Sequence, residues 1–237
     1  MRSAIFRQYD SRWGSLAYPT KEYSFANNGC GCCSVTHLLI EKDEYKDYTP
    51  ATVRKYMVKH ATKGHGTTWA GITDSLEHYG NKPKTISTMA DVWKECNKGN
   101  RAGILLFGAG TKGGVTWTSG GHYVAFLDYK LENGKHYFYT KDSGARKNDG
   151  WHCYETEMKG LIKQIWVVEL PVKVSYYKKC KADETSIVDG LKYIGVPSGK
   201  TVRQKIAKAN GIDTYTGTAV QNGKLLKLLK AGKLKKY

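Results

Sequence analysis

Asn27-Asn28-Gly29-Cys30-Gly31-Cys32-Cys33-Ser34 holds three of the chain's six cysteines within four residues. The apolar spacing that follows predicts a helix over residues 31–41, with Cys30 at its first turn. The first amide N–H groups of a helix have no partner inside the helix, so they favour an anion such as a thiolate. Gly29 and Gly31 carry no side chain and would let a substrate approach Cys30 closely. The stretch therefore predicts a helix that begins at a reactive cysteine.

Helical spacing continues beyond this stretch and then gives way to strands. Two more helices are predicted over residues 67–79 and 89–97. Asn133-Gly134 is the preferred sequence of a two-residue hairpin turn. Helices followed by an antiparallel sheet indicate the α+β class. The predicted strands are 102–107, 122–129, 136–140 and 163–170.

A second, smaller unit is expected after Pro171. Thr185 or Ser186 can cap its first helix, and Gly211 is a stop signal for its second. The three helices are predicted over residues 185–194, 201–210 and 219–229. The sequence thus predicts a domain at 1–170, a linker at 171–183 and a small three-helix domain at 184–237.

Positive charge is concentrated in the C-terminal part. Of the net charge of +17, residues 171–237 contribute +11, from 15 lysines and arginines against four aspartates and glutamates. Such a segment suits a polyanion: nucleic acid, an acidic membrane or wall polymers such as teichoic acids. Its lysines are not interleaved with aromatic residues as single-strand binders require, so nucleic acid is not the expected partner. A solvated helix face is the structural alternative.

The N-terminal residues show no secretion signal, because charged residues interrupt any apolar core there. No apolar run is long enough to span a bilayer. We therefore expect a soluble protein made in the cytoplasm, monomeric, with reduced cysteines. Three crowded cysteines also argue against an ordinary disulfide framework.

Two later residues are suited to act with Cys30. His122 follows two glycines and opens a predicted strand, where its ring can take the thiol proton and return it to a leaving amine. Asp142 ends the next strand and can orient that ring, provided the hairpin contains a bulge or an offset. Asp128 lies on the strand of His122 and is a poorer candidate.

The remaining candidates lie near Cys30 and His122 in the sequence. The backbone N–H of Cys30 can supply half of an oxyanion hole, and a side chain upstream would supply the second donor. Residues just before His122 are candidates for lining the cleft, with an ordinary loop as the equal alternative. The second-donor candidates are Asn28, Asn27 and Tyr23, and the cleft candidates are Trp117, Thr118 and Ser119.

Other roles are open for the cysteine cluster. Cys32 and Cys33 fit the role of packed helix residues. Together with Cys30 and His37 they offer thiolate and imidazole ligands for zinc. Structural zinc sites usually use two separated ligand pairs, and thiols this close on a helix point in different directions. No metal and no cofactor are therefore expected.

Four motifs together resemble the C39-like papain-fold cysteine peptidases: Gln8-Tyr9-Asp10-Ser11-Arg12-Trp13-Gly14, Asn28-Gly29-Cys30-Gly31, Gly121-His122-Tyr123-Val124 and Lys141-Asp142-Ser143. The resemblance covers roughly residues 6–170. It implies Cys30 as nucleophile, His122 as base and Asp142 as the residue that orients the base. The family usually continues Cys-Gly with Pro-Thr or Pro-Ser, whereas this chain continues with Cys-Cys-Ser.

The C-terminal part resembles small wall-binding modules of lysins from clostridia and their phages. Combined with the peptidase resemblance, this implies a phage endolysin that stays in the host cytoplasm until a holin releases it to the cell wall. The expected activity is cleavage of an amide bond in the stem peptide or cross-bridge of peptidoglycan. Two alternatives stand beside it: an N-acetylmuramoyl-L-alanine amidase using the same residues, and a non-catalytic protein that binds wall polymers or nucleic acid.

Overall fold

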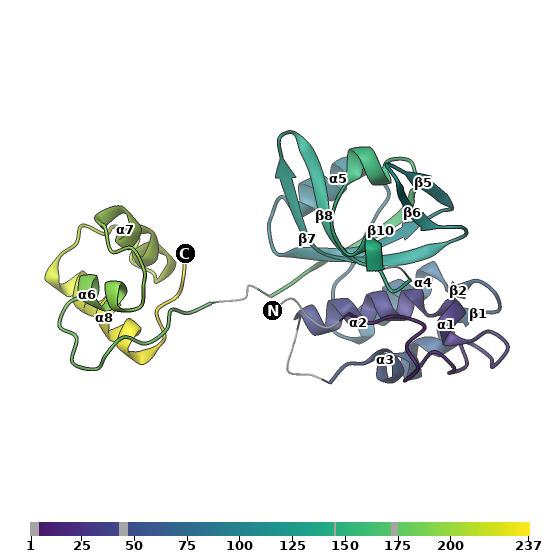
Figure 1. Cartoon of the computed structure of the whole chain (residues 1–237), viewed down its shortest axis with the longest axis horizontal. Helices are drawn as coiled ribbons and strands as arrows, with labels where there is room; N and C mark the ends of the chain where they lie inside the picture. Colours follow the sequence, from purple (N-terminus) through teal and green to yellow (C-terminus); the bar gives the residue numbers. More distant parts are fainter. Residues whose placement is uncertain (1–4, 43–46, 145, 172–174) are drawn as a thin grey trace. The chain divides into compact units, whose positions relative to one another are not determined.

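The computed structural model describes residues 5–42, 47–144, 146–171 and 175–237. The chain forms two compact units, Met1–Pro171 and Val172–Tyr237, each with a hydrophobic core of its own (Figure 1). Part of the predicted linker, residues 172–174, lies outside the described residues. No helix in the described ranges is long and apolar enough to cross a bilayer.

The first unit begins with helices that have clear start signals. Thr68 and Thr88 cap two helices that the sequence predicted, by accepting hydrogen bonds from the third amide of each. Thr49 forms a capping box ahead of Pro50 and starts a helix that was not predicted. The helices are α1 (Phe25–Asn28), α2 (Cys30–Lys42), α3 (Pro50–Met57), α4 (Trp69–His78) and α5 (Met89–Cys96), with a short η1 (Val58–His60) after α3.

The main sheet is six-stranded and antiparallel throughout, in the order β3-β10-β4-β7-β8-β9. Its strands are β3 (Lys84–Ile86), β4 (Arg101–Phe107), β7 (His122–Glu132), β8 (Lys135–Lys141), β9 (Gly150–Cys153) and β10 (Ile162–Glu169). Four of these match the predicted strands, while β3 and β9 were not predicted. Two separate two-stranded ribbons join β1 (Ala61–Thr62) to β2 (Gly66–Thr67) and β5 (Gly110–Lys112) to β6 (Val115–Thr118).

The β7–β8 hairpin turns at Asn133 and Gly134, both of which have positive φ, as the two-residue turn requires. Ala125 pairs with Lys141, and the register shifts between Phe126 and Asp128. This bulge takes up one residue of the difference between His122 and Asp142 in distance from the turn. Both residues lie at the same end of the hairpin, at the start of β7 and just after the end of β8.

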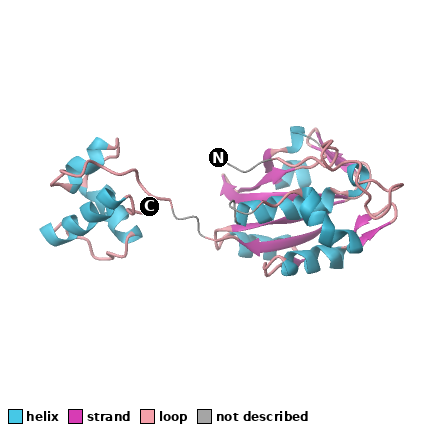
Figure 2. Cartoon of the chain, turned by 90° about the horizontal axis from the view of Figure 1, so that it is seen from below, coloured by secondary structure: helices cyan, strands magenta, loops and turns pink. Residues whose placement is uncertain are grey.

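Side chains of the sheet alternate between two cores. In β4, Ile104 and Leu106 pack with α2, whereas Leu105 and Phe107 pack with α5. Figure 1 shows α1 to α4 on one side of the sheet and α5 on the other, and Figure 2 shows the strands between helices. Both faces of the sheet are therefore covered, which explains why β4 is apolar at every position from Ala102 onward.

The second unit contains α6 (Ile187–Tyr193), α7 (Lys200–Ala209) and α8 (Ala219–Ala231). Ser186 caps α6, and Gly232 ends α8 in the left-handed conformation. The segment 175–183, expected as a linker, packs into this unit instead: the amide of Tyr177 donates to Leu234 O at 2.8 Å, and Cys180 is buried in the core. The sequence missed this because its lysines and tyrosines show no apolar periodicity.

Candidate active site

Cys30 is the first residue of α2, and Gly29 separates it from α1. A Cβ on Gly29 would lie 2.6 Å from the Phe25 ring, and one on Gly31 would lie 2.7 Å from Thr67 Oγ1. These glycines are thus required by close packing of the chain on itself. The expectation that they leave room for a substrate is corrected: Phe25 and Thr67 occupy that space.

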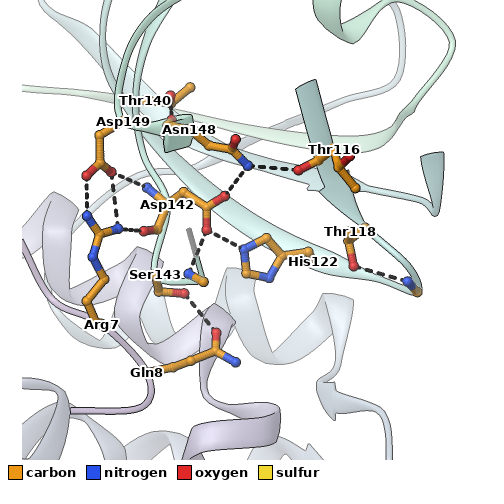
Figure 3. A network of polar contacts seen from close by, with 12 residues as sticks. Arg7, Gln8, Thr116, Thr118, His122, Thr140, Asp142, Ser143, Asn148 and Asp149 are labelled. Atoms are coloured by element: carbon orange, nitrogen blue, oxygen red, sulfur yellow. Dashed lines mark hydrogen bonds and ion pairs between the residues drawn. The ribbon is translucent and has the colours of Figure 1, made fainter. Parts of the chain in front are cut away.

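Cys30, His122 and Asp142 come together from α2, the start of β7 and the residue after β8. His122 Nε2 lies 2.7 Å from Asp142 Oδ1, as Figure 3 shows. The Cys30 thiol and the His122 ring lie close enough for each to shift the pKa of the other. Because Nε2 faces Asp142, Nδ1 is the ring nitrogen that is left to exchange a proton with Cys30. His122 and Cys30 are each 8% exposed and Asp142 is fully buried, so the chain of contacts is nearly shielded from water.

The electrostatics of this chain favour charge separation between Cys30 and His122. Burial alone would raise the pKa of Cys30, but the hydrogen bond and charge of His122 lower it, helped by the amides of Tyr123 and Gly31. Burial likewise opposes the imidazolium, yet Asp142 and Cys30 raise the pKa of His122 to about 10. Both pKa shifts therefore favour a thiolate beside an imidazolium over the neutral pair.

The pH dependence of Cys30 alkylation tests this ion pair. Thiolate forms as pH rises through the pKa of Cys30, so iodoacetamide should modify Cys30 with a midpoint below the ordinary thiol value of 9.0. In His122→Ala burial is opposed only by the amides of Tyr123 and Gly31, so the midpoint should rise above that of the wild-type protein. Peptide mass mapping across a pH series measures both. Equal midpoints in the two proteins would contradict the ion pair.

Asp142 is held from several sides. Its Oδ1 also accepts from the Gly144 amide at 2.7 Å, and its Oδ2 accepts from Asn148 Nδ2 at 2.8 Å. Arg7 donates to the backbone carbonyl of Asp142 and forms an ion pair with Asp149 (Figure 3). Burial would raise the pKa of Asp142, but its hydrogen bonds with His122, Gly144 and Asn148 lower it. Asp142 is thus ionised and fixed in orientation.

A pocket of about 200 Å³ opens onto Cys30. Asn27 and Asn28 both line it, and Asn28 is nearly buried, with Nδ2 donating to Ser24 O at 3.2 Å. Tyr23 is not among its lining residues. The rest of the lining is Gly64, His65, Gly66, Leu106, Gly121 and Tyr123. Of the candidate second oxyanion donors, the structure brings the two asparagines to Cys30.

The residues before His122 lie elsewhere. The Trp117 ring stacks on Phe107 with centroids 4.3 Å apart, and its Nε1 donates to Glu157 O at 2.8 Å. Ser119 is exposed, and Thr118 Oγ1 accepts from the Gly120 amide at 3.1 Å. None of the three lines the pocket at Cys30. The prediction that Trp117 lines the cleft is wrong because the β5–β6 ribbon places its side chain in the core.

Cys32, Cys33 and His37 are fully buried on α2. Burial raises the pKa of both thiols and lowers the pKa of His37 to about 3. Their environment is that of packed core residues. No group of three or more histidine, cysteine or acidic residues suited to a metal occurs in the described part of the chain.

No protein-family model and no curated protein matches this chain. Among solved structures, it is similar to the peptidase domain of Streptococcus ComA, a bifunctional ABC transporter of a quorum-sensing pathway. The TM-score is 0.47 at 16% identity, over 70% of this chain and 97% of that chain. A C39-like peptidase from Bacillus anthracis gives 0.41 at 13% identity, over 60% and 90%. A double-glycine-motif protease from an AMS/PCAT transporter, solved with its leader peptide, gives 0.38 at 15%, over 60% and 84%. At these identities the likeness concerns architecture and assigns no activity to this chain.

Sequence reasoning missed several residues around the site. The amide of Tyr123, the amide of Gly144 and the side chain of Asn148 all act through contacts that only the folded chain creates. Arg7 offered one signal, a basic residue directly after the apolar pair Ile5-Phe6. Nothing in the polar run around Asn148 separates it from an ordinary loop residue.

Proposed function

We propose that the first unit is a papain-like cysteine peptidase or amidase in which Cys30 attacks the carbonyl carbon of an amide bond. The observation that carries this proposal is the chain of side chains from Cys30 through His122 to Asp142, in which His122 is hydrogen-bonded to Asp142 at 2.7 Å and lowers the pKa of Cys30. Such a chain supplies a thiolate, a proton donor and a group that fixes the ring, which are the three parts that nucleophilic acyl transfer needs.

The geometry supports the following sequence of steps. The Cys30 thiolate adds to the carbonyl carbon, and the carbonyl oxygen becomes an oxyanion. The His122 imidazolium then gives its proton to the leaving nitrogen, the carbon–nitrogen bond breaks, and an amine departs from a thioester. Neutral His122 next takes a proton from water, which attacks the thioester and releases a carboxylate and the thiol. Asp142 keeps the ring oriented throughout and stabilises its charged form.

The oxyanion needs donors that are in place before the reaction. The Cys30 amide at the start of α2 is one candidate. Asn28 is the favoured second donor because it lines the same pocket, is nearly buried and uses Nδ2 in only one bond that the structure gives. Asn27 lines the pocket too but is exposed to water, which weakens an electrostatic contact.

The proposed substrate is peptidoglycan, cut at a stem-peptide or cross-bridge amide, as in an endolysin that lyses Gram-positive cells. The basic second unit supports this choice, since it is suited to hold the enzyme on anionic wall polymers. A pocket of about 370 Å³ in that unit has Lys205, Lys208 and Tyr215 among its lining residues. The sequence resemblance to wall-binding modules points the same way.

Digestion of purified Gram-positive peptidoglycan tests the activity. Mass spectrometry of the soluble products should reveal new amino termini in the stem peptide or cross-bridge. Release of intact stem peptides from the sugar would instead identify an N-acetylmuramoyl-L-alanine amidase acting through the same three residues. Walls left unchanged at every pH between 6 and 9 would contradict the proposal.

Wall binding by the second unit is a separate prediction. A fluorescent reporter fused to the full chain carrying Cys30→Ala should decorate cell walls, and Lys205→Ala with Lys208→Ala should weaken that binding. Lys224→Ala with Lys227→Ala removes the same charge from exposed positions on α8 and is the matched control. Binding to DNA alone, strongly weakened by salt, would favour a nucleic-acid partner instead.

A further inference from the structure

Asn148 is a fully buried residue at the end of η2 (Arg146–Asn148), beside the carboxylate of Asp142. Its Nδ2 donates to Asp142 Oδ2 at 2.8 Å and to the backbone oxygen of Thr116 at 3.1 Å (Figure 3). Its own Oδ1 is buried and has no hydrogen-bond partner among the described residues. The donor end of this amide therefore makes two hydrogen bonds, whereas its acceptor end makes none among the described residues.

The orientation of the amide follows from its neighbours. Both groups that face Nδ2 are acceptors, a carboxylate oxygen and a carbonyl oxygen. A flipped amide would place its oxygen against both of them, where like partial charges repel. The donor end must therefore point at Asp142. Leaving a buried acceptor without a partner costs free energy, which the contact made by the donor end has to offset.

The two oxygens of Asp142 thus have separate tasks. Oδ1 accepts from His122 and from the Gly144 amide, and Oδ2 accepts from Asn148. Without Asn148, the carboxylate loses the hydrogen bond to its Oδ2 and is held less firmly against rotation about its Cβ–Cγ bond. With Asn148 in place, rotation breaks a buried hydrogen bond to a charged group, which is among the stronger kinds.

We propose that Asn148 is a positioning residue that fixes the Asp142 carboxylate against His122 and so maintains the charged Cys30–His122 pair. This inference rests on the proposed function of these three residues. It extends the site to a residue that touches neither the thiol nor the imidazole. Asn148 also hydrogen-bonds to Thr116 in β6. Through Asn148, the Asp142 carboxylate is therefore connected to the segment that leads into His122.

A purely structural role is the competing explanation, because Asn148 also anchors its own segment. Its backbone oxygen accepts from Thr140 Oγ1 at 2.5 Å. Thr140→Val removes that anchor, keeps the side-chain shape and leaves the contact to Asp142 untouched. It is therefore the matched control for loosening of residues 146–149.

The test measures the rate of Cys30 alkylation by iodoacetamide against pH in the full chain, which needs no knowledge of the substrate. Asn148→Leu has nearly the same shape without a donor. Its alkylation rate at pH 7 should fall roughly tenfold, as loss of such supporting contacts typically does. Where the pH lies well below the midpoint, a tenfold fall corresponds to a rise of about one unit in the midpoint. Thr140→Val should lower the melting temperature and keep the wild-type midpoint.

A double-variant comparison separates positioning from general damage. In the Asp142→Ala background, Asn148→Leu should change the alkylation rate little, because the group through which it acts is gone. An equal further loss in that background, or a wild-type midpoint in folded Asn148→Leu, would overturn the inference. If the leucine variant does not fold, Asn148→Ala gives the same comparison. An ordinary thiol midpoint in the wild-type protein would instead count against the proposed function itself.

Discussion

Replacing Cys30 by alanine is expected to abolish the proposed cleavage of peptidoglycan, with a loss of at least about a thousandfold in rate. The physical reason is that no other thiol described in the structure shares its environment: its pKa is lowered by His122 at the start of a helix. Loss of turbidity of purified walls, followed at constant protein concentration, measures the effect. Folding of the variant is checked by its melting temperature.

Cys33→Ala is the matched control for this result. Cys33 lies three residues further along α2, is fully buried and has a raised pKa, so it has no access to substrate as a thiolate. We expect it to keep most of the wall-cleaving activity while losing some stability. Cleavage that survives in Cys30→Ala, or that disappears equally in both variants, would remove Cys30 from the mechanism.

The second large effect is on stability. Arg7 is nearly buried, pairs with Asp149 and donates to the Asp142 carbonyl, with side-chain exposures of 10% and 15% for the pair. Arg7→Ala removes the cation that pairs with Asp149 and the donor to the Asp142 carbonyl, and it leaves Asp149 with the Asp142 amide as its donor in a largely dry site. We expect the free energy of unfolding to fall by about 3 kcal/mol, the lower end for a broken buried pair.

Urea unfolding followed by tryptophan fluorescence measures this loss in the first unit alone. All six tryptophans lie between residues 13 and 166, so the second unit contributes no signal. Arg12→Ala is the control, because its ion pair with Asp10 is exposed on the arginine side at 67%. That exposed pair is screened by water and should contribute little to stability. Equal losses in the two variants would show that burial of the Arg7 pair is not what matters.

The sequence predicted the parts of the fold that have a regular pattern. The apolar run of β4, the Asn133-Gly134 turn and the helix at Cys30 each follow from local spacing and turn chemistry. Segments with little local pattern were missed. β3 has three residues, only Ile86 of which is buried, and its place in the sheet comes from pairing with β10. A strand this short is specified by its partner and not by its own residues.

The residues of the site also divide into those that local sequence patterns predict and those that only tertiary contacts place. Cys30, His122 and Asp142 sit at the ends of predicted elements, so their positions could be inferred from chain order and one hairpin. Asn148 lies in a turn whose path depends on tertiary contacts, and no local rule places it beside a carboxylate. Trp117 is a residue for which the local argument was wrong. Its closeness to His122 in the sequence predicted a cleft residue, but in the β5–β6 ribbon its side chain packs on Phe107.

The bulge between Phe126 and Asp128 divides the β7–β8 hairpin into two parts that differ in how well they tolerate a change in length. On the side of His122 and Asp142, adding or removing one residue would turn every side chain up to these two residues to the opposite face of the sheet. Beyond the bulge, the tip around Asn133 is exposed and contacts no part of the site. The tip is therefore the natural place for length variation between relatives, and a suitable point at which to insert a label or an affinity peptide.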